Sequence, residues 1–255
     1  MKNNTLIHPS AIVSKKAIIG NNVTIGQFTT IYDNVRILDN TVIEGYCEIG
    51  VQNHLSNEKE LIIGKNSYIR SHSIFYEGSV FGDKLITGHR VTVREKTIAG
   101  KNLQLGTLSD IQGHCTIGNY VRMHSNVHIG QASKIGNYIW LFPYVVLTND
   151  PHPPSNVMQG VELEDFSVIS TKSVILPGVK VAEGCLIGAN STLSIKTEPN
   201  MLYNGNPAKK ICLASRLRLK DGSKKPAYPW IKHFNRGYPQ EVLKEWEAFL
   251  NEGII

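Results

Sequence analysis

Long apolar runs, cysteine pairs and dense charge are all absent from this 255-residue chain. No segment stays apolar over the roughly 20 residues that a transmembrane helix needs, so a membrane-spanning protein is not expected. The N-terminus lacks the pattern of a signal peptide, which favours a cytoplasmic location. The 4 cysteines include no CxxC pair, and no cluster has the spacing of metal ligands, so no catalytic metal is expected.

Excess charge is also small, and its distribution limits the classes of partner. The net charge is +6, and the basic residues gather between Lys209 and Lys225 without interleaved aromatic residues. Nucleic acid is therefore not an expected partner. Two interpretations of the basic segment stay open: a solvated tail, or a surface that attracts a phosphorylated ligand such as coenzyme A or a sugar nucleotide.

An apolar residue returns at every sixth position over most of the chain. Three series, starting at Ile7, Ile63 and Ile169, hold 28 such positions, of which 27 are apolar, whereas a composition of 41% hydrophobic would fill about 11. Thr87 is the exception. A sustained repeat of this length fits neither a helix nor simple strand alternation and marks a solenoid. The sequence thus predicts an all-β solenoid with these core positions facing inward.

Two further positions of the repeat support this prediction. The residue after the core position is glycine twelve times, which suits a repeated turn because glycine tolerates positive φ. The fourth residue after the core position is small or β-branched and should also face inward. Cys47, Cys115 and Cys185 occupy it, which favours structural filler over a redox role. Three hexapeptides would form one triangular coil, so residues eighteen apart become vertical neighbours.

The repeat is interrupted twice, and a solenoid accommodates insertions as loops. Residues 51–62 shift its register, and residues 149–166, NDPHPPSNVMQGVELEDF, contain three prolines and cannot continue as strand. A loop as long as residues 149–166 is typically functional or disordered.

The end of the chain follows another pattern. Residues 1–211 are expected to form the solenoid and residues 212–255 a small helical appendage. ASRLRLK predicts one short helical piece, and a longer helix should start at Pro239 and end at Gly253. Trp246, Phe249 and Leu250 share one face of that helix, which should pack against the solenoid or a neighbouring molecule.

The period of eighteen also sorts candidate reactive groups. His114 and Asp150 both stand three residues after a core position and are 36 apart, which predicts one vertical column with Ala132 between them. The resulting notch could hold a sugar hydroxyl or amine, and Asn149 adds an amide beside it.

A second pair competes with the first. Asp110 and His128 are eighteen apart and should be adjacent on neighbouring coils, where a carboxylate could orient an imidazole for general-base work. His124 and His152 are secondary candidates.

These motifs resemble a known family. Over roughly residues 5–211 the repeat resembles the hexapeptide-repeat acyltransferases, which implies a left-handed parallel β-helix, and NGNPAKKI at 204–211 resembles their closing segment. The stretch from Leu105 to Ser155, LGTLSDIQGHCTIGNYVRMHSNVHIG through LFPYVVLTNDPHPPS, resembles the branch that N-acetylates nucleotide-linked amino sugars for bacterial surface polysaccharides, particularly 3-amino-3,6-dideoxyhexoses carried on dTDP.

The resemblance implies transfer of acetyl from acetyl-CoA, a co-substrate rather than a bound cofactor, within a homotrimer whose active sites lie between subunits. His114, Asn149 and Asp150 would stand at the reacting end, with His114 either a general base or a clamp on the sugar. Further substrate contacts are expected at Asp110, His124, His128, Arg70, Arg90 and Arg94. Acetyl-CoA contacts are expected at Gly178 and Ala189 for the pantetheine arm and at Lys172, Lys209 and Lys210 for the phosphates.

Two alternatives remain open at this stage. One is transfer to a sugar hydroxyl, or of a longer acyl chain, on the same scaffold. The other is a non-catalytic β-helix that serves as a structural or binding subunit.

Overall fold

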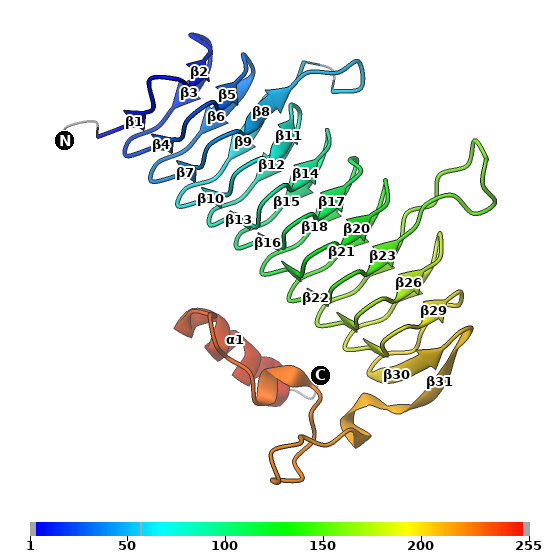
Figure 1. The fold of residues 1–255 in the computed structure, drawn as a ribbon. Coiled ribbons are helices and arrows are strands. Elements are labelled where there is room, and N and C mark those ends of the chain that lie inside the picture. Colours follow the sequence, from blue (N-terminus) through cyan, green and yellow to red (C-terminus); the bar gives the residue numbers. More distant parts are fainter. Residues whose placement is uncertain (1–3, 57, 252–255) are drawn as a thin grey trace.

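The chain folds into a triangular prism of stacked short strands, seen in a computed structural model that describes residues 4–56 and 58–251 (Figure 1). Each strand pairs in parallel with the strand three further along the chain, so the prism has three faces. Vertical neighbours are eighteen residues apart wherever no loop intervenes, as in the pairing of Asp110 with His128. The predicted all-β solenoid is confirmed.

Face A is a twelve-stranded sheet that ends in an antiparallel hairpin. Its strands are β1 (Leu6–Ile7), β4 (Thr24–Ile25), β7 (Val42–Ile43), β10 (Tyr68–Ile69), β13 (Ile86–Thr87), β16 (Gln104–Leu105), β19 (Arg122–Met123), β22 (Trp140–Leu141), β25 (Val168–Ile169), β28 (Leu186–Ile187), β30 (Met201–Gly205) and β31 (Ala208–Leu213).

Faces B and C hold ten and nine parallel strands. Face B contains β2 (Ile12–Val13), β5 (Thr30–Ile31), β8 (Glu48–Val51), β11 (Ile74–Tyr76), β14 (Thr92–Val93), β17 (Asp110–Ile111), β20 (His128–Ile129), β23 (Val146–Leu147), β26 (Val174–Ile175) and β29 (Thr192–Leu193). Face C contains β3 (Ile18–Ile19), β6 (Val35–Ile37), β9 (Leu61–Ile63), β12 (Val80–Phe81), β15 (Ile98–Ala99), β18 (Thr116–Ile117), β21 (Lys134–Ile135), β24 (Glu162–Leu163) and β27 (Lys180–Val181).

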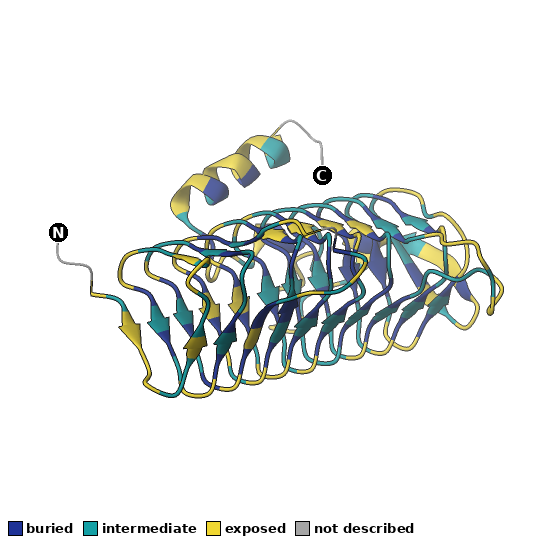
Figure 2. Cartoon of the chain, turned by 90° about the horizontal axis from the view of Figure 1, so that it is seen from above, coloured by how far each residue is buried: buried dark blue, intermediate teal, exposed yellow. Residues whose placement is uncertain are grey.

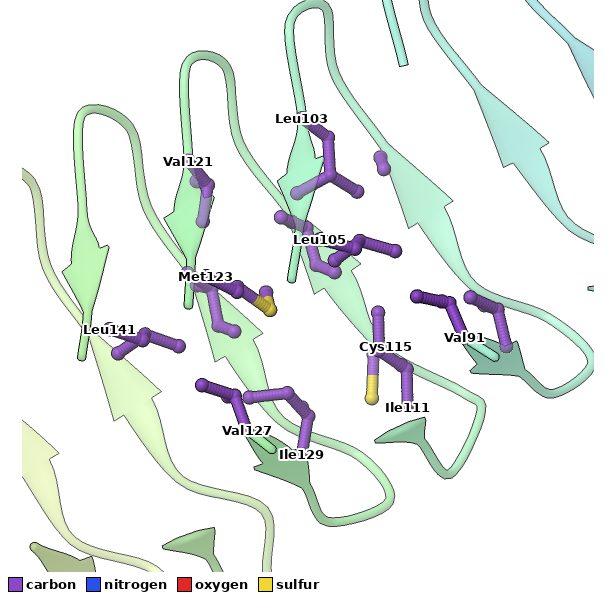
Figure 3. Close-up of a cluster of buried hydrophobic side chains, with 14 of the residues drawn as sticks. Val91, Leu103, Leu105, Ile111, Cys115, Val121, Met123, Val127, Ile129 and Leu141 are labelled. Carbon is purple, nitrogen blue, oxygen red and sulfur yellow. The ribbon is translucent and has the colours of Figure 1, made fainter. Parts of the chain in front are cut away.

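The prism interior is filled by the two inward positions of the repeat (Figure 3). Core residues such as Leu105 and Met123 are buried, and so are residues of the small position such as Val121 and Cys115. Thr87, the one polar core residue, is also buried, and its hydroxyl accepts a hydrogen bond from the Arg70 amide at 2.9 Å. The buried Thr87 hydroxyl therefore has a hydrogen-bond partner in the backbone of the preceding coil.

The expected reason for the repeated glycines is wrong. Of the twelve, only Gly50 has positive φ, at 92°. The left-handed turn lies instead three residues after the core position, as at Leu108 with φ 60°. Gly106 shows what the glycines do: a Cβ there would lie 2.3 Å from the backbone carbonyl carbon of His124 on the next coil. The coils approach too closely for a side chain at this point.

Both interruptions of the repeat leave the prism at the edge where face B turns into face C, which we call the BC edge (Figure 1). The first, residues 52–60, joins β8 to β9, and the second, residues 148–161, joins β23 to β24. The second ends earlier than position 166, because Glu162 and Leu163 already pair with Lys134 and Ile135.

The C-terminal segment covers part of face A (Figures 1 and 2). It contains two short 3-10 helices, η1 (Ala214–Arg216) and η2 (Trp230–Lys232), and the helix α1 (Gln240–Asn251). The expected piece over ASRLRLK is thus shorter than predicted, whereas the longer helix is confirmed; its expected end at Gly253 lies outside the described residues. Within those residues, no helix has the length and apolar character needed to cross a bilayer.

Aromatic packing holds this segment on the solenoid. Trp246 is buried with ring centroids 5.5 Å from Tyr138 and 5.3 Å from Trp230, and Phe249 packs against Phe166 at 5.9 Å. The apolar face of α1 therefore meets the solenoid, which was one of its two expected partners.

Candidate functional site

One residue of each coil marks the BC edge, and His114 stands near the middle of this column. Strand register places His114 above Lys96 and below Ala132, because Thr116 pairs with Ile98 and with Lys134. Above Glu60, the last residue of the 52–60 loop, this BC column continues with Gly78, Lys96, His114, Ala132, Gly160 and Gly178. The 52–60 loop interrupts this column below Gly78 and the 148–161 loop interrupts it above Ala132, so the two loops bracket His114.

Asp110 and His128 meet on the outer surface of face B, in two strands that lead to this edge. His128 Nδ1 lies 2.9 Å from Asp110 Oδ2, and the Gln112 amide donates to both carboxylate oxygens at 2.8 and 2.7 Å. Among the described residues, nothing bonds to His128 Nε2. A carboxylate that fixes one imidazole nitrogen and leaves the other available is a general-base arrangement.

Charge and hydrogen bonding keep Asp110 ionised. Burial by itself would raise its pKa, but hydrogen bonds from His128 and Gln112, together with electrostatic interaction with His128 and Arg94, bring the pKa of Asp110 below its usual value. The carboxylate is therefore poised to hold the imidazole rather than to exchange a proton itself.

His114 is exposed at a left-handed turn with φ 52°. Its amide donates to the Glu95 carbonyl at 3.0 Å, while its ring makes no hydrogen bond to any described residue. The imidazole is thus open to a ligand, and no carboxylate orients it.

The expected column of His114, Ala132 and Asp150 is wrong. Lys134 and Glu162 are vertical neighbours although they are 28 residues apart, ten more than one coil. The place above Ala132 is consequently held by Gly160, whose added Cβ would lie 2.0 Å from the Ala132 carbonyl oxygen. The ten inserted residues displace Asp150 into the loop.

Asn149 and Asp150 form the foot of that loop. The Asn149 carbonyl accepts a hydrogen bond from the Gln159 amide at 2.8 Å, which closes the loop at its base. Asp150 accepts from the Ser155 hydroxyl at 2.7 Å and from the amides of Ser155 and His152 at 3.1 and 3.2 Å. The Ser155 hydroxyl is the main reason that the pKa of Asp150 lies below its usual value. In this structure Asp150 organises the loop beside the BC edge.

Of the remaining substrate candidates, only Arg94 lies with this group. It stands on face B beneath Gln112 and contributes to the lowered pKa of Asp110. Arg70 and Arg90 lie at the opposite edge, between faces A and B. His124 also lies at that AB edge, half-buried and stacked on Phe142 at 4.8 Å. Burial, followed by the charge of Arg122, lowers the pKa of His124.

The candidates for acetyl-CoA contacts are likewise divided. Gly178 belongs to the BC column three coils above His114, with only Ala132 and Gly160 between them. Lys172 and Ala189 lie at the AB edge, where the Asn190 amide bonds the Thr171 carbonyl. Lys209 and Lys210 lie on β31, and Lys210 is paired with Glu198 at 2.7 Å.

Three of the four cysteines are buried. Cys47 and Cys115 are buried, and burial raises the pKa of each thiol to about 11. No group of three histidine, cysteine, aspartate or glutamate side chains within residues 4–56 and 58–251 is arranged to hold a metal ion.

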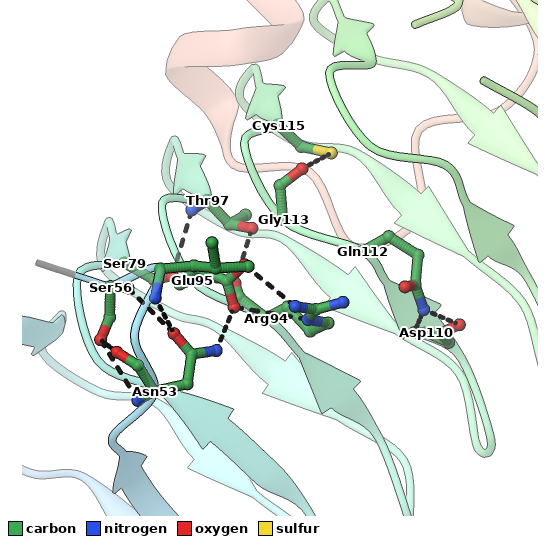
Figure 4. A network of polar contacts seen from close by, with 11 residues as sticks. Asn53, Ser56, Ser79, Arg94, Glu95, Thr97, Asp110, Gln112, Gly113 and Cys115 are labelled. Atoms are coloured by element: carbon green, nitrogen blue, oxygen red, sulfur yellow. Dashed lines mark hydrogen bonds and ion pairs between the residues drawn. The ribbon is translucent and has the colours of Figure 1, made fainter. Parts of the chain in front are cut away.

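Sequence reasoning missed three polar residues near the site, Gln112, Glu95 and Asn53 (Figure 4). Gln112 could have been predicted from the sequence, because residues two apart on a strand share a face and Gln112 lies two residues after Asp110. The bond between Asn53 and Glu95 spans 42 positions and depends on the path of the 52–60 loop, for which the repeat gives no signal.

Several known proteins are similar to this chain over part of its length. A family model described as the GMPPB C-terminal domain matches residues 1–104. The acyl-[acyl-carrier-protein]–UDP-N-acetylglucosamine O-acyltransferase of Campylobacter concisus is 28% identical over 225 residues, which cover 77% of this chain and 81% of that protein. A chloramphenicol acetyltransferase of Klebsiella aerogenes is 28% identical over 37% of this chain, which spans only 49% of that relative.

Solved structures agree on the fold. The Arabidopsis UDP-N-acetylglucosamine acyltransferase gives a TM-score of 0.60 at 17% identity, covering 82% of this chain and 74% of that one. The Bacteroides fragilis UDP-N-acetylglucosamine acyltransferase gives 0.56 at 18% identity, covering 94% and 81%. These structures show the left-handed parallel β-helix fold. With the six-residue repeat, the relatives in sequence identify the chain as an acyltransferase of the hexapeptide-repeat family.

Proposed function

We propose that the protein is an acetyl-CoA-dependent N-acetyltransferase whose acceptor is the amino group of a nucleotide-linked sugar, with a dTDP-linked 3-amino-3,6-dideoxyhexose as the leading candidate. The supporting observations are the Asp110–His128 pair on face B and the exposed His114 ring at the BC edge that follows, on a coil between the two loops. The amino-sugar acceptor rests on the likeness of residues 105–155 to that branch of the family.

The BC column also supports a path for acetyl-CoA. Above His114 the column carries only Ala132, Gly160 and Gly178, one small residue per coil. A pantetheine arm can lie along these small residues without meeting a large side chain. This path would bring the thioester to His114. Lys172 and Ala189 lie at the other edge of face B, so one acetyl-CoA contacts both sets only where two prisms stand side by side. This favours the homotrimer, with a mass three times the 28.3 kDa of the chain.

The chemistry requires little of the protein beyond placement and proton control. The sugar nitrogen attacks the thioester carbonyl, the C–S bond breaks, and the nitrogen loses a proton that finally resides on the coenzyme A thiol. His114 can accept that proton, or it can bind a sugar hydroxyl while the departing thiolate takes the proton directly. His128, fixed by Asp110, is the competing base. Correct placement by itself supplies much of the rate enhancement.

The test is thiol release from acetyl-CoA against a panel of dTDP-linked 3-amino and 4-amino sugars. We expect release with at least one amino sugar and a fall in kcat of about 100-fold or more for the variant whose histidine is the base. If His114→Ala keeps kcat and raises KM, His114 binds the sugar and is not the base. The loss in kcat is then expected for His128→Ala. Absence of release with every amino sugar would refute the proposal.

A second acceptor class has support from one observation. The relative that covers 77% of this chain is named as an O-acyltransferase of UDP-N-acetylglucosamine that uses an acyl carrier protein. Acyl transfer from acyl carrier protein to that sugar hydroxyl, with no transfer to any amine, would establish this alternative in place of the first.

A further inference from the structure

The 52–60 loop folds back along the BC edge toward the candidate site (Figure 4). Asn53, at the start of this loop, donates from Nδ2 to Glu95 Oε2 at 2.8 Å, although Glu95 belongs to the coil just below that of His114. Ser56 is buried and lies against Gly78, where an added Cβ would be 3.1 Å from the Ser56 carbonyl oxygen. The loop therefore reaches from its own coil to the coil of Arg94 and Lys96.

Glu95 connects the loop to an exposed cation. Its side chain is 0% exposed, so its charge needs partners, and Arg94 supplies two hydrogen bonds, from Nε at 3.4 Å and from Nη2 at 3.2 Å. Burial alone would raise the pKa of Glu95, but the Asn53 amide, its own backbone and Arg94 together lower it, so the side chain is a carboxylate. Asn53 and Glu95 thus fix one edge of the Arg94 guanidinium.

The other edge of Arg94 is free for a ligand. The side chain is 33% exposed, and no described residue accepts a hydrogen bond from Nη1. Lys96, two residues further on and directly below His114, has no described carboxylate within ion-pair distance. Two cations with unused donors therefore lie beside the reacting end, at a guanidinium held in place before any ligand arrives. A fixed guanidinium edge suits the planar, paired oxygens of a phosphate group.

We propose that Arg94 and Lys96 bind the diphosphate of the nucleotide-linked acceptor, and that Asn53 and Glu95 are positioning residues that hold Arg94 for this contact. The inference rests on the proposed function for the identity of the ligand. It assigns the first interruption of the repeat a role: the 52–60 loop sets the substrate side of the site, as the 148–161 loop sets the opposite side.

The same loop provides a matched control. Ser56 donates from its hydroxyl to Glu77, a second buried carboxylate one coil below Glu95, and Asn34 donates to the other oxygen of Glu77 at 3.0 Å. This arrangement resembles that of Asn53 with Glu95, but no described arginine is bound to Glu77. The Ser56 hydroxyl also donates to the Asn53 carbonyl at 2.7 Å, and the Asn53 side chain accepts from the Ser56 amide at 2.9 Å. Ser56→Ala should therefore disturb the loop, as Asn53→Ala does, while the bond from the Asn53 amide to Glu95 remains.

The experiment measures dTDP binding by titration calorimetry for the full-length protein and its variants. We expect Arg94→Ala to weaken dTDP about tenfold or more, and Asn53→Ala and Glu95→Gln each to weaken it about three- to tenfold. Ser56→Ala should stay within about twofold of the parent. With an active amino-sugar substrate, Asn53→Ala should raise KM by a similar factor and leave kcat unchanged, because neither positioning residue touches the reacting atoms.

Three outcomes would overturn the inference: no dTDP binding by the parent protein, equal effects of Asn53→Ala and Ser56→Ala, or an unchanged affinity in both Asn53→Ala and Glu95→Gln. Should Glu95→Gln fail to fold, the comparison of Asn53→Ala with Ser56→Ala decides, since both variants remove hydrogen bonds within the loop. If dTDP binds and depends on Asn53 while no amino sugar is acetylated, the proposed function fails and the phosphate subsite stands.

Discussion

At the scale of single residues, the pair of Asp110 and His128 shows how a simple repeat acquires reactive geometry. Both residues occupy outward positions one coil apart, so the fold itself brings them within 2.9 Å of each other. Gln112 then saturates the carboxylate from the same strand. The folded state thus favours the ionised form of Asp110, and its pKa lies below the usual value. Stability should depend on pH for this reason.

Asp110→Asn should reveal that dependence. Because the folded-state pKa is depressed, the contribution of Asp110 is present above the unfolded-state pKa of about 3.9 and is lost as the pH falls through the lower folded value. We expect the variant to lose about 1 kcal/mol of unfolding free energy at pH 7 and to approach the parent protein below about pH 3. Urea denaturation at both pH values measures the difference, and a gap that does not narrow in acid would contradict this account.

At the scale of the elements, each coil turns at two kinds of position with opposite demands. The glycine after a core residue faces the backbone of the next coil, as at Gly106. The residue three after the core position adopts left-handed φ, as Ala132 does at 64°. The sequence pattern marks the first kind with glycine, while the second kind carries residue types as different as asparagine, lysine, tyrosine, leucine and alanine and gives no uniform signal.

Exchanging glycine and alanine at the two positions should therefore have opposite effects. Gly106→Ala should lower the unfolding free energy by more than about 2 kcal/mol, since its Cβ would lie 2.3 Å from a backbone atom that cannot move freely. Ala132→Gly should leave stability unchanged or raise it by up to about 1 kcal/mol, because glycine relieves the left-handed strain. Chemical denaturation followed by circular dichroism compares them; similar losses in both variants would show that the two positions do not differ.

The repeat explains which parts of the fold and site could be predicted. Burial of residues such as Leu105 and contact between Asp110 and His128 follow from a local count of six and eighteen. Asp150 was misplaced because the count fails across a loop: ten inserted residues bring Gly160 over Ala132. The reach of Asn53 to Glu95 was missed for the same reason. Periodicity determines side-chain placement within coils, while loop paths depend on tertiary contacts that no period encodes.

At the scale of the whole molecule, two cores with different properties lie side by side. The solenoid core is one continuous column of aliphatic residues, in which each coil contacts chiefly its neighbours. The second core joins face A to the C-terminal segment and is dominated by aromatic rings, among them Tyr138, Trp230, Tyr238 and Trp246. Since these two clusters are separate, the segment should be able to detach while the coils remain folded.

Trp246→Ala tests this division. The side chain is 2% exposed and its ring centroid lies 4.5 Å from that of Tyr238, so its removal should cost about 3–5 kcal/mol of the docking free energy. Hydrogen exchange should then show lost protection over 230–251, while amides of β14, β17 and β20 exchange as in the parent protein. Glu247→Ala, on the exposed side of the same helix, is the control and should change neither region. Equal loss of protection in the coils would contradict this division. It would mean that the two cores unfold as one cooperative unit, because the stability of the solenoid would then depend on the docked C-terminal segment.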